Sequence, residues 1–418
     1  MQQLLSNRNF RLFWVGETIS LLGDQFYLIA LPWLVLQLTG DPLIMGTVLA
    51  VAGIPRALFM LFGGVLTDRF TPRLVMLVSN LLRMALVGGL AAAVLLGATQ
   101  LWLIYLFALS FGLADAFFYP AQSAIVPQLV ERDRLQLANT LTQGTVQLSL
   151  FAGPVLAGSL IAAFGTGGNL DIRGIGLALL VDATTFFASA LTLWFIRQDT
   201  APATLSAEQN MLSAMRDGIQ TVWREPVLRA IFILIAAANF LIVGPMNIGI
   251  PILADTRLSD GAASFGIIMS AFGAGSLIGL VLAAGLPRPR EKRLGLVLTV
   301  VWSLVGFNLA LMGLMTTTPL IAGAALLMGM ANSYVTVTFI TWLQLRVPAA
   351  AMGRVMSLMM FFSAGLLPLS NTLSGFVADL SLTGLFVGFG LTMTVLVMVT
   401  LAPNPRIRRM EVGVMTGD

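Results

Sequence analysis

The sequence contains neither cysteine nor histidine in its 418 residues. Without cysteine there is no disulfide, no thiolate metal site and no thiol nucleophile. Without histidine the chain lacks the usual general base and the commonest metal ligand. No nucleotide-binding G-x-x-x-x-G-K-[ST] motif occurs in it either. These absences argue against a hydrolase, a membrane acyltransferase and a metalloenzyme, so we expect a protein that is not an enzyme and needs no cofactor or metal.

Charge is also scarce, because only 10% of the residues are charged whereas soluble domains carry about 25%. Hydrophobic residues make up 57% of the chain, more than a soluble protein of this size can bury, which indicates that its solvent is lipid. A helix needs about 20 apolar residues to cross a membrane. We predict an all-α membrane protein with twelve transmembrane helices in two pseudo-symmetric six-helix bundles. The predicted spans lie near residues 11–38, 43–66, 73–97, 101–126, 137–164, 174–196, 228–253, 262–286, 294–316, 319–344, 350–378 and 382–402.

The longest hydrophilic stretch separates the two sets of six spans. It divides the chain into an N-terminal bundle at 1–197, a cytoplasmic linker at 198–226, and a C-terminal bundle with a short tail at 227–418. Apolar residues recur at helical spacing within the linker, which favours an amphipathic helix on the inner membrane surface; a plain linker is the alternative. These apolar residues are Leu212, Met215, Ile219 and Val222.

Lysine and arginine residues set the orientation of the chain, because cytoplasmic loops carry an excess of both. Most of the 23 fall in segments that are cytoplasmic if the N-terminus lies inside. We therefore predict a multi-pass protein of the cytoplasmic (inner) membrane with both termini in the cytoplasm. The basic residues are scattered over short loops and form no patch, so nucleic acid is not an expected partner.

Six charged residues lie inside the apolar stretches, all of them in the first half of the chain. A charge within a membrane span is costly and is a functional-site hypothesis by default. Counting along each helix from its inner end at 1.5 Å per residue puts five of them in one central layer and Glu17 nearer the cytoplasm. An acidic group in that layer without a cationic partner is a candidate proton carrier. The six residues are Glu17, Asp24, Arg56, Arg83, Asp115 and Asp182.

The loop after the second predicted span reads G-V-L-T-D-R-F-T-P-R from residue 64 to residue 73. It resembles the signature loop of the major facilitator superfamily, G-x-L-x-D-R-x-G-(R/K)-(R/K), with Thr71 and Pro72 standing where the pattern has a glycine and a basic residue. The resemblance implies that the loop acts as a conformational switch through ion pairs that depend on conformation. The matching residues are Gly64, Leu66, Asp68, Arg69 and Arg73.

A second signature lies in the fifth predicted span, where Gly153, Pro154 and Gly158 resemble the G-P-x-x-G-G element of the antiporter branch of this family. Ala157 replaces the first glycine of the final pair. Four further segments look like the drug-exporter branch that includes macrolide-efflux and enterobactin-exporter-like proteins. They are S-L-L-G-D at 20–24, I-P-R at 54–56, Y-P-A at 119–121 and G-R-V at 353–355.

The family fold implies that spans one and four line a central cavity, that two and five flank it, and that three and six lie behind. On this basis we expect Asp24 to be the principal proton acceptor. Arg56 would stabilise the ionised form of Asp24, and Asp115 would be a second titrating or cargo-contacting group. For these three residues the alternative is a structural role as polar contacts between helices. Arg83 and Asp182, behind the cavity, are expected to form a buried structural pair.

Glu17 lies two helical turns before Asp24 and on the same face of the first span. Because it is nearer the cytoplasm, we expect it either to relay protons toward that side or to be a water-exposed residue at the end of the helix.

The second half of the chain repeats the plan without the charges. Aligning Pro32 with Pro251 places the uncharged Val243 opposite Asp24. An apolar wall with a few hydrogen-bonding groups suits an amphiphilic cargo, and the substrate-cavity candidates are Asn239, Asn247, Asn332 and Tyr334.

Small residues four apart in spans five and eight predict close helix contacts in lipid. The family fold implies that these two spans meet, so we expect one seam formed by Ser149, Gly153 and Ala157 with Ala271, Gly275 and Gly279.

Together these features predict a secondary transporter that exports a lipophilic or amphiphilic small molecule, such as a drug, a macrolide or a siderophore-like compound. Export would proceed by proton-coupled antiport and alternating access. The alternative on the same fold is a flippase for lysophospholipid or another lipid. The expected partners are the cargo, protons and membrane lipid, and we expect a monomer.

Overall fold

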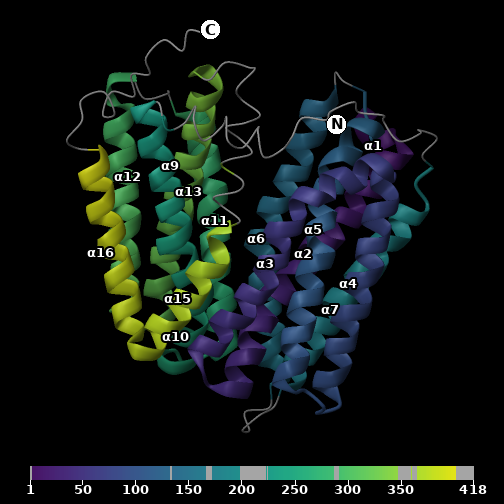
Figure 1. The fold of residues 1–418 in the computed structure, drawn as a ribbon, viewed down its shortest axis with the longest axis horizontal. Coiled ribbons are helices and arrows are strands. Elements are labelled where there is room, and N and C mark those ends of the chain that lie inside the picture. The colour runs from purple at the N-terminus through teal and green to yellow at the C-terminus, as the bar shows by residue number, and fades with distance from the viewer. Residues whose placement is uncertain are drawn as a thin grey trace. The chain divides into compact units, whose positions relative to one another are not determined.

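The computed structural model describes residues 2–131, 134–165, 172–197, 225–286, 291–346 and 365–401, together with residues 223 and 359. Within these ranges every regular element is a helix (Figure 1). Eleven helices of the described part are long and apolar enough to cross a membrane, and the segment Val227–Arg257 counts as one of them. Of the span predicted at 350–378, the structure describes the second part. The predicted amphipathic helix of the linker lies outside the described residues.

The described residues of the first half form seven helices. Asn7 caps the second of them, because its side chain accepts hydrogen bonds from the main-chain N–H groups of Asn9 and Phe10. That helix ends at Gly40, whose φ of 63° is the left-handed conformation that favours glycine. The helices are α1 (Gln2–Ser6), α2 (Arg8–Thr39), α3 (Pro42–Arg69), α4 (Pro72–Leu95), α5 (Leu101–Leu129), α6 (Leu135–Phe164) and α7 (Arg173–Trp194).

The second half begins with a helix that is not α-helical throughout. After α9 (Pro226–Ala238) come two π-helical turns, η2 (Asn239–Val243) and η3 (Pro245–Gly249), before α10 (Ile250–Arg257). Single π-turns of this kind are rare and are often found at functional sites. The remaining helices are α11 (Gly261–Gly285), α12 (Glu291–Met312), α13 (Thr318–Arg346), α15 (Leu367–Leu380) and α16 (Leu382–Leu401).

The chain divides into two compact units by its internal contacts. Unit 1 comprises Met1–Ser206 and Pro251–Ser270, and unit 2 comprises Ala207–Ile250 and Ala271–Asp418. The first part of α11 therefore packs with the helices of the first half. The bundle boundaries expected at residues 197 and 227 stay a prediction, since most of the linker between them lies outside the described residues.

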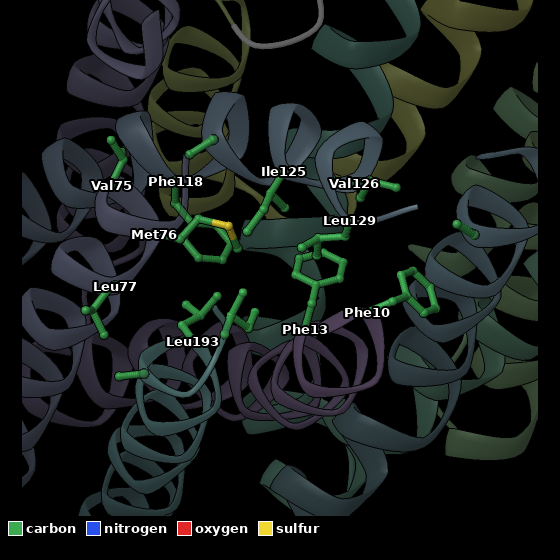
Figure 2. Close-up of a cluster of buried hydrophobic side chains, with 14 of the residues drawn as sticks. Phe10, Phe13, Val75, Met76, Leu77, Phe118, Ile125, Val126, Leu129 and Leu193 are labelled. Atoms are coloured by element: carbon green, nitrogen blue, oxygen red, sulfur yellow. The ribbon is translucent and has the colours of Figure 1, made fainter. Parts of the chain in front are cut away.

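In unit 1, α3 packs chiefly on α5, and α7 packs against both α2 and α4 (Figure 1). A hydrophobic cluster fills the end of this bundle that carries α1, with Phe10 and Phe13 from α2, Met76 from α4 and Phe118 from α5 (Figure 2). Each of these side chains is almost fully buried, so the cluster is the apolar core of this end of the bundle. In unit 2, α12 packs on α16 and α13, and α15 lies against η2, η3 and α16.

The close contact expected between spans five and eight exists, but other residues form it. On α6, a Cβ at Gly158 would meet the main chain of Ala262 and Gly266, and the N–H of Val155 donates to Ser270 Oγ at 2.8 Å. These residues of α11 belong to unit 1.

Three of the six seam residues named from the sequence face elsewhere. Gly153 lies against Gln25 of α2, while Gly275 and Gly279 lie against Leu326 and Met330 of α13. The reason is helical geometry. Gly266 and Gly275 are nine residues apart, which at 3.6 residues per turn puts them on roughly opposite faces of α11. The sequence spacing found a close-packed face of this helix, but not the face that meets α6.

Candidate proton-coupling site

Asp115 on α5 is the centre of the charged layer. Its Oδ1 accepts a hydrogen bond from Nη2 of Arg83 on α4, and its Oδ2 lies 3.2 Å from Nη1 of Arg56 on α3. One carboxylate therefore connects three helices. Arg56, which we expected to act on Asp24, forms its ion pair with Asp115, and the partner of Arg83 is also Asp115 and not Asp182.

The environment of Arg83 explains this choice of partner. Its guanidinium carbon lies 4.0 Å from the ring centroid of Phe118 and 5.5 Å from that of Phe186, and the side chain is 1% exposed. Phe186 comes one turn after Asp182 on α7, so the guanidinium sits one helical turn away from the carboxyl with which we expected it to pair. The prediction of an Arg83–Asp182 pair was wrong for this reason.

The aromatic rings around these guanidiniums were missed in the sequence. Arg83 also lies 5.8 Å from the ring of Phe111, and Arg56 lies 4.5 Å from the ring of Tyr119. A cation over an aromatic face is favourable, and more so when it is removed from water. The signal was present, because Phe111, Asp115 and Phe118 recur at the spacing of one helical face.

Glu17 is not the exposed helix-end residue that we considered. It is 2% exposed, and Nε2 of Gln122 on α5 donates a hydrogen bond to its Oε1. Its second oxygen, Oε2, is buried and has no hydrogen-bond partner in the described part of the chain.

Asp182 on α7 is fully buried, with 0% exposure. Its Oδ1 is 3.4 Å from Oγ1 of Thr185, and its Oδ2 has no partner among the described residues. The carboxyl lies against Gly23 of α2, where an added Cβ would be 2.7 Å from Oδ1. Glycine at this position therefore brings the Asp182 carboxyl close to the α2 main chain beside Asp24.

Asp24 differs from the other three acidic residues in this layer. It is half-buried, and no described group forms a hydrogen bond with it. Its carboxyl interacts electrostatically with Arg83 and Arg56, the same guanidiniums that bind Asp115. Arg56 itself is 44% exposed at its side chain, whereas the Asp115 side chain is only 10% exposed. The accessible part of the charged layer thus consists of Asp24 and Arg56.

The sequence as a whole matches a known protein family. The sequence model described as Major Facilitator Superfamily matches residues 13–369. The chain belongs to the major facilitator superfamily. It is therefore a multi-pass membrane transporter and not an enzyme, with the twelve-helix fold of this superfamily.

Similar superfamily members include exporters. The chain is 25% identical over 402 residues to the multidrug efflux pump Tap of Mycolicibacterium fortuitum, covering 94% of each chain. It is 21% identical to macrolide efflux protein A of Streptococcus pyogenes, covering 88% of this chain and 89% of that protein. It is 25% identical to the enterobactin exporter EntS of Shigella boydii, covering 83% and 79%.

Solved superfamily structures share the fold at low sequence identity. A crystal structure of the nucleoside transporter NupG matches with a TM-score of 0.72 at 17% identity and covers 94% of this chain and 98% of its own. A bacterial homologue of the iron transporter ferroportin in an inward-facing state matches with a TM-score of 0.71 at 16% identity, covering 94% and 99%.

The superfamily's signature loop is described in part. The main chain of Gly64, Asp68 and Arg69 is helical and continues α3, and their side chains lie outside the described residues. Arg73 donates from Nε to the carbonyl of Leu193 at 2.8 Å and from Nη2 to that of Trp194 at 2.7 Å. A cation at these last carbonyls caps the C-terminal end of α7.

The substrate-cavity candidates of the second half do not form one cluster. Asn247 in η3 donates to Oδ1 of Asn371 on α15 at 3.3 Å, and Asn239 donates to the carbonyl of Ile235 in its own helix. On α13, Asn332 is exposed and Tyr334 is half-buried, two positions apart and so on different faces. Asn371 was not among the candidates. Its role in bridging α15 and η3 could not be read from spacing alone.

Proposed function

We propose that this transporter is a proton-coupled antiporter that exports a lipophilic or amphiphilic small molecule, and that Asp24 is its exchangeable proton site. One observation carries the proposal. Among the four carboxyl groups of the charged layer, Asp24 alone combines partial exposure with the lack of a hydrogen-bond partner in the described chain. A group that must gain and lose a proton in each cycle needs access, and it needs freedom from fixed partners.

In this scheme the other charged residues set the charge balance around Asp24. Asp115 is held by two guanidiniums and serves as a fixed anchor of this layer. Arg56 and Arg83 together carry one more charge than Asp115 balances. An ionised Asp24 supplies the missing negative charge, and a proton on Asp24 leaves that excess uncompensated. We propose that the proton and the cargo compete for Asp24, as antiport by alternating access requires.

We infer the direction of transport and the class of cargo from the similar proteins and from the composition of the second half. The similar proteins with named activities are a multidrug efflux pump, a macrolide efflux protein and an enterobactin exporter. In the second half, deeply placed side chains are apolar with few amides, which suits an amphiphile. We propose export of such a compound across the cytoplasmic membrane by a monomer, with Asn247 and Tyr334 among the groups that contact the cargo.

Replacing Asp24 with asparagine tests the proposal. Asn keeps the shape but cannot release a proton, so we expect Asp24→Asn vesicles to lose all uptake of a labelled macrolide that is driven by an imposed pH gradient. The matched control is Asp379→Asn, which neutralises an exposed carboxyl at the end of α15 and should transport like the wild type. Gradient-driven uptake that survives in Asp24→Asn would refute the role of Asp24. Movement of labelled lysophospholipid between leaflets, with no macrolide uptake, would indicate a flippase instead.

The orientation of the chain can be tested with single cysteines, because the natural sequence has none. Ala98 is exposed in the loop between α4 and α5, and the Glu131 side chain is 75% exposed after α5. With both termini in the cytoplasm, Ala98→Cys should react with a membrane-impermeant maleimide on intact cells. Glu131→Cys should react only after the cells are opened. The reverse pattern would contradict the predicted topology.

A further inference from the structure

The charged layer holds more acidic groups than its cations can balance. Two guanidiniums face four carboxyl groups, and both guanidiniums bind Asp115. An ionised Asp24 uses the one remaining positive charge. Neither Glu17 nor Asp182 then forms an ion pair within the described residues, although both are almost completely buried. An isolated carboxylate out of water is very costly, and such a group takes up a proton instead.

We propose that Asp182 is a second proton-binding site, which holds a resident proton beside the exchangeable proton of Asp24. The carboxyl of Asp182 has 0% exposure, its Oδ2 lacks any hydrogen-bond partner among the described residues, and it points toward α2 at Gly23. The hydroxyl of Thr185 donates to the main-chain carbonyl of Asp182 at 2.7 Å and lies 3.4 Å from Oδ1. This set of contacts fits a neutral carboxylic acid and does not fit an ionised one.

The groups that face Asp182 from the neighbouring helices agree with this assignment. α7 packs against α2, α4 and α6. An ionised Asp24 on α2 would repel a negative charge on Asp182. Tyr27, also on α2, interacts with Asp182 but carries no positive charge that could balance it. Arg83 on α4 interacts with Asp182 electrostatically but hydrogen-bonds to Asp115. The sequence of α6 contains no charged residue.

The resident proton has a consequence for Asp24. Two adjacent carboxyls resist joint ionisation, because the second charge is repelled by the first. When Asp182 keeps its proton, Asp24 can ionise toward Arg56 and Arg83 without that repulsion. Asp182 is thus a positioning residue for proton exchange, and the pair exchanges one proton per cycle, at Asp24. This inference rests on the proposed function only in naming Asp24 as the exchanging partner.

Infrared spectroscopy of the purified protein in lipid nanodiscs tests the protonation state directly. Protonated carboxylic acids absorb in a carbonyl-stretch region where carboxylates do not. We expect the wild type to show such absorption at neutral pH, with one component lost in Asp182→Asn and a separate one lost in Glu17→Gln. After transfer to D2O the Asp182 component should shift slowly, since the group is fully buried. Asp379→Asn replaces an exposed carboxyl group far from the charged residues of α2 to α7 in the sequence and should leave this region unchanged.

A second variant tests the same inference if Asp182→Asn fails to fold. Thr185→Val keeps the side-chain shape but removes the hydroxyl near Oδ1. It should shift the Asp182 component to higher frequency without removing it, because a weaker hydrogen bond stiffens the C=O bond. Ser189→Ala is the matched control, since it removes a buried hydroxyl further along α7 that accepts from Asn80 at 2.9 Å. It should shift nothing in this region.

The inference is overturned if Asp182→Asn loses no component, or if Thr185→Val shifts none. The first result would mean that Asp182 is ionised, and the second that the component does not come from a carboxylic acid beside Thr185. The proposed function fails by a different measurement, when pH-driven uptake persists in Asp24→Asn. The two failures are therefore distinguishable.

Discussion

An Asp115→Asn chain will lose about 3–5 kcal/mol of unfolding free energy, the cost of breaking a buried ion pair by removing one partner. Arg83 is 1% exposed and its guanidinium hydrogen-bonds to Asp115. Without that carboxylate, Arg83 would remain as a buried cation beside three aromatic rings, which cannot replace a full negative charge. The loss can be measured by titrating the purified protein with sodium dodecyl sulfate and following tryptophan fluorescence.

A double variant separates lost charge balance from lost packing. Arg83→Met with Asp115→Leu removes both charges and fills most of their volume, and such replacements are often neutral or stabilising. We expect the double variant to recover most of the stability that Asp115→Asn loses. If the double variant is as unstable as Asp115→Asn alone, the ion pair is not the source of the loss.

A single methyl group at Gly158 will abolish transport. The added Cβ would meet the main chain of Gly266, 3.0 Å from its Cα and 3.1 Å from its N, and would come still closer to the carbonyl of Ala262. Main-chain atoms cannot rotate away, so α6 and α11 must move apart, and overpacking of this kind costs about 1–3 kcal/mol. The separation would also break the hydrogen bond from Val155 to Ser270.

The same helix supplies the control for Gly158→Ala. A Cβ at Gly144 on α6 would meet no atom within 4 Å, and alanine is a better helix former than glycine by up to about 1 kcal/mol. Gly144→Ala should therefore transport normally and unfold at the same or a higher detergent concentration. Macrolide uptake in vesicles compares the two variants directly. Equal uptake by both would show that the approach of α6 and α11 is not required.

The fold followed from the sequence because it depends on features that sum over many residues. Apolar segments of about 20 residues, a scarcity of charge and one signature loop indicate membrane helices and their grouping. The six intramembrane charges could also be found, because each stands alone in an apolar stretch.

The pairing of those charges could not be found in the same way. Whether Arg83 meets Asp115 or Asp182 depends on a shift of one helical turn, and predicted helix ends are uncertain by about that much. The burial of Glu17 was missed because depth along a helix says nothing about which side chain covers it. Here Gln122 on α5 contacts its carboxyl group. The predicted contact of Gly275 with span five was wrong because a stripe of small residues indicates a close helix contact but does not identify the partner helix.

The two π-turns in the segment from α9 to α10 shift the residue-by-residue alignment of the two halves of the chain. Each π-turn holds about one residue more than an α-turn. Counting back from Pro251 to Val243 passes through η3 and ends in η2, so the equivalence of Val243 with Asp24 is displaced by one or two positions. A duplicated gene that acquires such turns changes which side chains face a given direction without any substitution. The side chains that the two halves present at equivalent positions can thus come to differ by insertion of a residue as well as by substitution.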